Sequence, residues 1–132
     1  MSTLDVLLKA DTKKLKSRKS IKVKMPRLSE RAGSPVVFEV GCVPNRFLAE
    51  VGDIDTQNRD EAYERTLDLI VEATIDPDFR DARLYKEHLG CATPNDAVDK
   101  LLDTGEIKIV TDAIMKACGA ISQDEADTTV KN

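Results

Sequence analysis

The 132-residue sequence contains no tryptophan, two tyrosines and three phenylalanines. A core must therefore be built mainly from leucine, isoleucine, valine and alanine, which favours helices packed on helices or on a small sheet. Apolar runs are short as well: none approaches the roughly 18 residues that span a bilayer, and the N-terminus lacks an unbroken signal-peptide core. We therefore expect neither membrane insertion nor secretion, and no membrane partner.

Cysteine and histidine are scarce, with three cysteines and one histidine in the chain. Cys42, Cys91 and Cys118 show no paired motif spacing, which argues for a reducing cytoplasm and against a disulfide framework. A single histidine weakens any Cys–His or Ser–His nucleophile. The sequence also lacks the GxxxxGK[ST], GxGxxG and GxSxG motifs. These absences predict a protein with no catalytic residues and no bound cofactor.

Two patterns are partial matches to metal sites. His88 and Cys91 have His-x-x-Cys spacing, but a closed zinc site needs four ligands and no second pair has comparable spacing. The acidic stretch 53–64 places oxygen ligands as a calcium loop does, with Asn58 where that loop requires glycine and Asp60 where an apolar residue is usual. We interpret the first as a histidine beside a buried cysteine and the second as a solvated loop, so no metal is predicted.

Charge is abundant but unevenly distributed. Residues 1–33 carry ten Lys or Arg against three Asp or Glu, a net of +7, and residues 34–132 carry ten against twenty-one, a net of −11. Such opposed halves favour an interaction segment, intramolecular attraction, or head-to-tail self-association of copies. The basic stretch Lys9–Lys24 also allows phosphate binding, so a small nucleic-acid-binding or regulatory protein is the alternative function. Because this stretch has no aromatic side chain to stack on a base, nucleic acid is the less favoured partner.

The apolar pattern of the first third of the chain predicts a β-hairpin. Residues 21–25 and 36–42 alternate apolar and polar side chains, as expected of two strands, and residues 29–35 between them are typical of a turn. A hairpin alone is marginally stable, so it should lean on helices. The fold class predicted here is α+β, with an N-terminal β-hairpin packed on a mostly α-helical bundle of about four to five helices.

Beyond Pro44 the apolar spacing becomes helical. Helices are expected near residues 44–52, 59–74, 81–88, 94–104 and 106–118. Thr93 followed by Pro94 gives the clearest helix start in the sequence. The predicted organisation is a flexible basic N-terminal segment at 1–20, a single α+β domain at 21–120 and a mobile polar tail at 121–132.

Two apolar patches are candidates for partner binding. Three leucines near the N-terminus have i, i+3 and i+4 spacing and precede a polar linker, and a similar stripe follows Pro44 on a short helix. Ordinary core packing is the competing interpretation of both patches. The predicted partner-binding residues are Leu4, Leu7, Leu8, Phe47, Leu48 and Val51.

Several segments of the chain, taken in order, resemble one protein family. Each carries a turn, cap or strand signature; they are Ala10–Leu15, Ile21–Ser29, Gly33–Val40, Ile75–Phe79, Thr93–Pro94 and Leu101–Ile107. In their order and spacing they resemble the XkdN-like family of phage and prophage tail assembly chaperones. The resemblance implies a non-catalytic protein of the host cell cytoplasm that is absent from the mature virion.

The same resemblance implies two protein partners in tail morphogenesis. Such a bacteriophage chaperone is expected to bind the tape measure protein and to help recruit tail tube subunits around it. A tape measure protein is long and apolar in stretches, and it aggregates easily before the tube encloses it. A small helical domain suits this role, because it can present a groove to an amphipathic helix whose anchors have i, i+3, i+4 and i+7 spacing.

Overall fold

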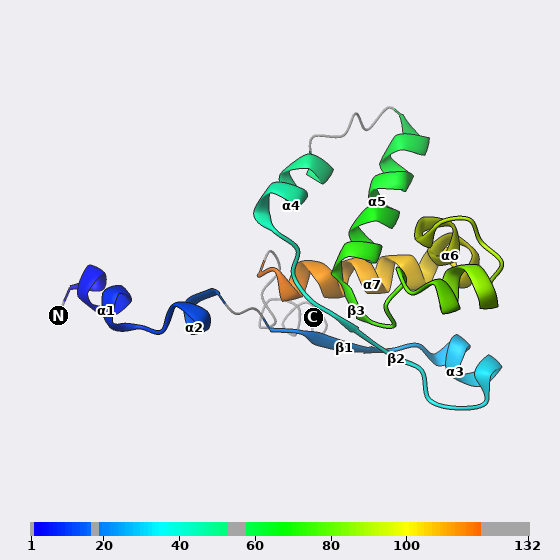
Figure 1. Cartoon of the computed structure of the whole chain (residues 1–132), viewed down its shortest axis with the longest axis horizontal. Helices are drawn as coiled ribbons and strands as arrows, with labels where there is room; N and C mark the ends of the chain where they lie inside the picture. The colour runs from blue at the N-terminus through cyan, green and yellow to red at the C-terminus, as the bar shows by residue number, and fades with distance from the viewer. Residues whose placement is uncertain (1, 17–18, 53–57, 120–132) are drawn as a thin grey trace, which may run out of the picture.

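The structure, a computed structural model, describes residues 2–16, 19–52 and 58–119. Its elements in chain order are α1 (Thr3–Lys9), α2 (Thr12–Lys16), β1 (Ile21–Lys24), α3 (Pro26–Ala32), β2 (Val37–Val40), α4 (Asn45–Gly52), α5 (Arg59–Ala73), β3 (Thr74–Asp76), the π-helix η1 (Arg83–His88), α6 (Pro94–Leu101) and α7 (Thr104–Ala117). Figure 1 shows two parts of different character. Helices α1 and α2 form an arm that extends to one side, and the elements from β1 to α7 form a folded domain.

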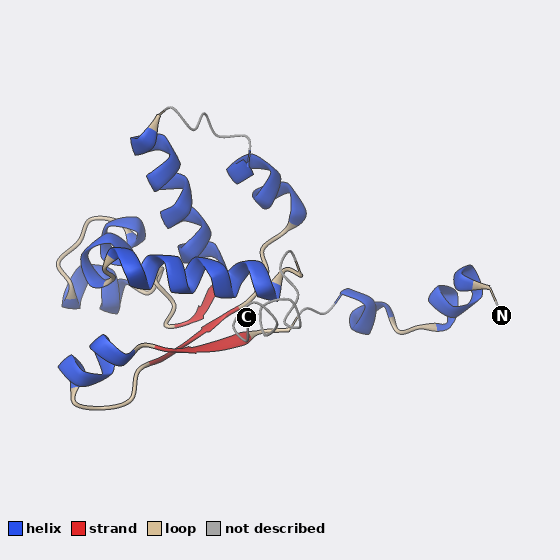
Figure 2. Cartoon of the chain, turned by 180° about the vertical axis from the view of Figure 1, so that it is seen from behind, coloured by secondary structure: helices blue, strands red, loops and turns tan. Residues whose placement is uncertain are grey.

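The domain contains a small antiparallel sheet with the strand order β1–β2–β3. Val23 of β1 lies opposite Phe38 of β2. Side chains alternate between the two faces of a strand, so Phe38 and Val40 are buried on the inner face while Lys22 and Lys24 are exposed. Helix α7 contacts β1 and β2, and α5 packs on α7 (Figure 2).

The core lies between the sheet and helices α5, α6 and α7. Its largest fully buried side chains are Phe38, Phe79, Met25, Leu67, Ile70, Ile114, Val40, Val98 and Val110. The rings of Phe38 and Phe79 meet edge to face, with centroids 5.8 Å apart. The long helix predicted at 59–74 is confirmed as α5, and Leu67 and Ile70 are buried on its inner face.

The predicted β-hairpin is wrong, because a helix separates its two strands. Residues 26–32 form α3 where the sequence indicated a turn. Pro26 stands in the first turn of this helix, and Gly33 ends it in the left-handed region at φ 75°. Leu28 is the one buried residue of α3. A seven-residue helix with a single inward side chain has almost no helical period to detect in the sequence.

The predicted fold class is wrong in two further respects. The chain begins with the helices α1 and α2, and the described residues contain eight helical segments rather than four or five. Strand β3 was not predicted: the backbone becomes extended at Thr74, directly after α5, and pairs with β2. The molecule is therefore a mixed, largely helical protein with a small three-stranded antiparallel sheet.

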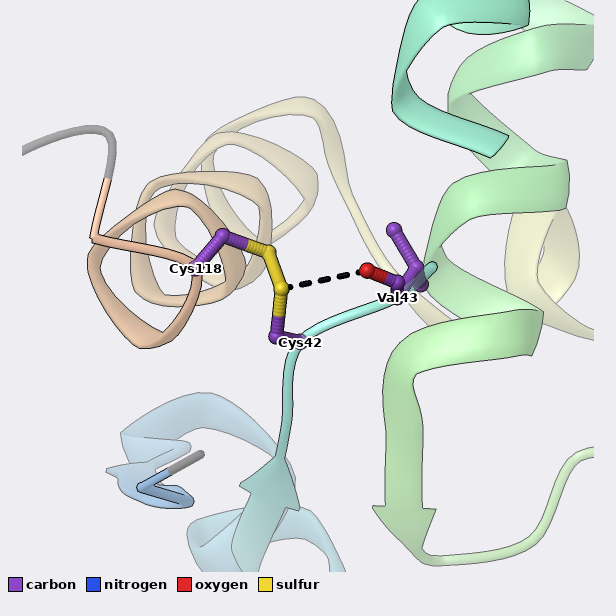
Figure 3. The surroundings of a disulfide bond; sticks show 3 residues. All are labelled: Cys42, Val43 and Cys118. Carbon is purple, nitrogen blue, oxygen red and sulfur yellow. Dashed lines mark hydrogen bonds between the residues drawn. A yellow bond between two sulfur atoms is a disulfide. The ribbon is translucent and has the colours of Figure 1, made fainter. Parts of the chain in front are cut away.

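A disulfide joins Cys42, which follows β2, to Cys118 at the end of α7 (Figure 3). Their Cα atoms lie 4.6 Å apart although 76 positions separate them in the sequence. The sulfur of Cys42 also lies 3.2 Å from the carbonyl oxygen of Val43. The prediction against disulfide pairing is therefore wrong, and Cys91 is the free cysteine. The pairing depends on α7 lying against the sheet, which cysteine spacing alone does not reveal.

Candidate functional site

The three leucines of α1 form an apolar face that the domain does not cover. Leu4, Leu7 and Leu8 are 63%, 50% and 73% exposed, and no residue of α1 is buried. At 100° per residue the three leucines share one side of the helix, whereas Val6 points from the opposite side. Figures 1 and 2 show the arm directed away from every element of the domain. Core packing, the competing interpretation of this patch, therefore does not hold for these leucines, and partner binding by them stays a prediction.

Local hydrogen bonds, rather than packing, define where α1 begins. The backbone N–H of Asp5 donates to Ser2 Oγ at 3.2 Å, and the N–H of Ser2 donates to the Asp5 carboxylate at 3.4 Å. This reciprocal pair is a capping box, and Lys9 in the last turn complements the helix dipole. An isolated helix of this length is marginal in water. A partner that covers the leucines would therefore stabilise α1 as well.

The second predicted stripe lies on α4, inside the domain. Phe47 and Leu48 are half-buried and pack against the hydrophobic core, and α4 contacts α5. Val51 belongs to α4, but its side chain lies outside the described part of the structure. Core packing thus accounts for the two described residues, and partner binding by this stripe stays a prediction. The structure does not bring α4 and α1 together (Figure 1).

A groove that the sequence did not predict lies at the α3 end of the domain, between α3, β2 and η1. Its volume is about 530 Å³. Its apolar walls include Leu28, Val36, Val37, Leu84, Leu89 and Leu101. Arg31, Asp76 and His88 also line it. These residues come from five separate parts of the chain, and α3 resembled a turn in the sequence, so no local pattern indicated the groove.

An ion pair fixes the position of α3, which forms one wall of the groove. Arg27 Nη2 donates to Glu106 Oε1 at 2.6 Å and to the carbonyl oxygen of Leu101 at 2.6 Å. Glu106 Oε1 also accepts the backbone N–H of Asp103 at 3.0 Å, which completes the capping box of α7. The hydrogen bond to Glu106 raises the pKa of Arg27. Because Glu106 is buried, its carboxylate needs this cation, and α3 is thereby tied to α7.

An acidic hollow adjoins the groove at the loop between β3 and η1. Its lining contains Asp76, Asp78 and Asp81 together with Arg83 and His88. Arg83 donates to the Asp81 carboxylate at 2.6 Å, and this hydrogen bond lowers the pKa of Asp81 to about 2. Asp76 and Asp78 make no ion pair with any described residue. Their negative charge is therefore available to a basic partner.

The two metal-site patterns gain no further ligand from the fold. His88 is exposed at the end of η1, and Cys91 is half-buried with its thiol directed at the carbonyl oxygen of Leu89. Within residues 2–16, 19–52 and 58–119, no group of three His, Cys, Asp or Glu side chains is placed to hold a metal. Residues 53–57 of the acidic stretch lie outside the described residues.

The basic stretch Lys9–Lys24 is divided among three elements. Lys9 ends α1, Lys13 lies in α2, and Lys22 and Lys24 lie on the exposed side of β1. The structure therefore spreads these charges over the arm and the sheet edge rather than along one helix face. No helix in the described part of the chain is long and apolar enough to cross a bilayer.

Comparison with known proteins connects this architecture to a family. No curated protein and no solved structure matches the chain. A family model described as the phage XkdN-like tail assembly chaperone protein matches residues 4–131. That match covers both the arm and the domain, and it confirms the resemblance found in the ordered segments of the sequence. The chain belongs to the phage XkdN-like tail assembly chaperone family.

Proposed function

We propose that this chaperone binds the tape measure protein through the leucine face of α1 and helps recruit tail tube subunits around it. The observation that carries the proposal is the exposure of Leu4, Leu7 and Leu8 on a helix without a single buried residue. Their i, i+3 and i+4 spacing is that of helix anchors that pack on another apolar helix face. Covering them would contribute about 1–2 kcal/mol for each leucine.

The domain supplies solubility in this proposal. Residues 21–117, which span the domain from β1 to α7, carry thirteen Lys or Arg against nineteen Asp or Glu, a net charge of −6 that opposes aggregation of a complex with an apolar partner. The chaperone acts in the cytoplasm of the infected host, is absent from the mature virion, and works by binding rather than by catalysis. Recruitment of tube subunits falls to the surface that remains exposed once α1 is occupied.

Co-expression with the tape measure protein encoded in the same genome tests the proposal. Affinity purification and mass determination of the complex should give a soluble species with several copies of the chaperone for each tape measure protein. Leu7→Asp should remove most of the soluble tape measure protein, because it places a charge in the middle of the leucine face. Its melting temperature should equal that of the wild type, since α1 contributes nothing to the core.

Val6→Asp provides a matched control for Leu7→Asp. It introduces the same charge into the same helix, but on the side opposite the leucines. The proposal expects Val6→Asp to hold the tape measure protein in solution as the wild type does. Equal loss of solubility in both variants, or in neither, would rule out the leucine face as the binding surface.

A further inference from the structure

We propose that the groove between α3, β2 and η1 binds α1 of a second copy of this chain, so that copies of the chaperone associate head to tail. The inference rests on the exposed leucine face used in the proposed function, and it assigns that face a second partner. In the absence of the tape measure protein, the arm of one copy then occupies the groove of the next. The tape measure protein competes with the groove for the same three leucines.

The two surfaces match in apolar character. The face of α1 presents Leu4, Leu7 and Leu8, and the groove presents Val37, which is 41% exposed, together with Leu84 and Leu89. A groove of about 530 Å³ gives room for several aliphatic side chains. Each surface leaves apolar area in water within a single copy, and their contact removes both areas from water.

The two surfaces also match in the order of their charges. On the arm, the apolar helix α1 ends at Lys9 and leads through the extended residue Ala10 into α2, which contains Lys13. On the domain, the apolar groove leads into the hollow that contains Asp76 and Asp78. When the leucines occupy the groove, we expect Lys9 and Lys13 to face the adjoining hollow. Charge pairs of this kind at an interface rim fix the orientation of docking more than its strength.

The position of the arm favours a second copy over the arm's own domain. The arm joins the domain at the start of β1, whereas α3 and the groove lie beyond the other end of that strand (Figures 1 and 2). The arm and the groove are therefore at opposite ends of one molecule. A contact between unlike surfaces of two copies leaves one arm and one groove unoccupied, so further copies can add. This is the head-to-tail arrangement that the opposed charges of the two halves of the sequence favour.

Sedimentation velocity of the full chain with two complementary variants tests the inference. The wild type should sediment faster as its concentration rises. Leu7→Asp places a charge on the leucine face of the arm, and Val37→Glu places one in the groove. Each variant alone should self-associate at least about tenfold more weakly than the wild type and should sediment as a monomer. An equimolar mixture of the two variants should form a heterodimer and no larger species. The intact arm of Val37→Glu binds the intact groove of Leu7→Asp, and no second pair of intact surfaces remains for a third copy.

Ala32→Glu serves as a second groove variant, because Ala32 is exposed at the end of α3 and lines the same groove. A wild type that stays monomeric at every concentration overturns the inference, and so does a mixture that forms no heterodimer. If the inference fails in this way but Val37→Glu still holds the tape measure protein in solution, the proposed function is supported and only the groove proposal is wrong. If the chain self-associates but does not bind the tape measure protein, the groove proposal is supported and the proposed function is wrong.

Discussion

The arm and the domain of this chaperone use the same residue type for different purposes. Leucines in α1 are half to three-quarters exposed and touch no core, whereas Leu67 and Leu69 of α5 are buried. The arm is defined by hydrogen bonds between residues three or four positions apart. The domain depends on contacts between distant segments, such as Arg27 with Glu106. We therefore expect the stability of the domain to be independent of α1, which has no buried residue and leaves its leucines available for partners.

The same substitution in the two regions should separate their roles most strongly. Leu67→Ala removes a side chain that is 1% exposed in the core, and we expect it to lower the free energy of unfolding by about 2–5 kcal/mol. Leu8→Ala removes a side chain that is 73% exposed, and the change should stay below about 0.5 kcal/mol. Urea unfolding followed by circular dichroism measures both. Similar losses in the two variants would show that α1 packs on the domain.

Removal of the disulfide should be the next largest effect, and it concerns the domain alone. The bond between Cys42 and Cys118 closes a loop across 76 positions. Replacing both residues by serine should lower the free energy of unfolding by about 2–4 kcal/mol, because the unfolded chain regains conformational freedom. The wild type should be more stable in oxidising than in reducing buffer, while the double variant should be equally stable in both. A free energy of unfolding of the wild type that is equal in the two buffers would contradict the pairing of Cys42 with Cys118.

Loss of a helix cap should have a smaller effect, and its site should decide whether the domain responds. The Thr93 side chain accepts a hydrogen bond from the backbone N–H of Asp96 at the start of α6, and Thr93→Ala should cost about 1 kcal/mol of domain stability. Ser2→Ala removes the corresponding cap from α1. It should lower the helix signal of residues 3–9 in NMR without changing the melting temperature. A falling melting temperature in Ser2→Ala would contradict the independence of the arm.

The smallest expected effect is a shift in one titration. Tyr63 of α5 donates a hydrogen bond to Asp99 of α6, and burial, followed by this hydrogen bond, raises the pKa of Tyr63 to about 12. The raised pKa favours the folded state below the ordinary tyrosine pKa of 10.0, and this contribution is lost as the pH rises toward about 12. The arm contains no tyrosine, so tyrosinate absorbance reports on the domain only. Tyr63→Phe should abolish the ionisation near pH 12, and an unchanged titration would contradict the contact.

Local signals made part of the fold predictable from the sequence. The start of α6 is confirmed at Thr93 and Pro94, and α5 lies where the helical apolar spacing predicted a helix at 59–74. The helical spacing of Leu4, Leu7 and Leu8 corresponds to the helix α1 at Thr3–Lys9. In each case the residues that determine the structure are neighbours in the chain, so their spacing carries the information.

Features that depend on distant contacts were missed or predicted wrongly. Strand β3 exists because Thr74 and its neighbours meet β2, and the disulfide exists because the end of α7 meets Cys42. The groove requires α3 to be held against α7 by Arg27. None of these contacts leaves a periodic signal in the sequence. The division into segments at residues 20 and 120 stays a prediction, as do the partner-binding roles of the leucines.

Hydrogen–deuterium exchange on the purified complex with the tape measure protein tests the central claim most directly. The reference is the free chain at a concentration where it is monomeric. We expect strong new protection at the amides of α1, residues 3–9, and unchanged exchange in the core helices α5 and α7. Exchange in α1 that stays as fast as in the free chain, with new protection confined to the domain, would contradict the assignment of α1 as the binding element.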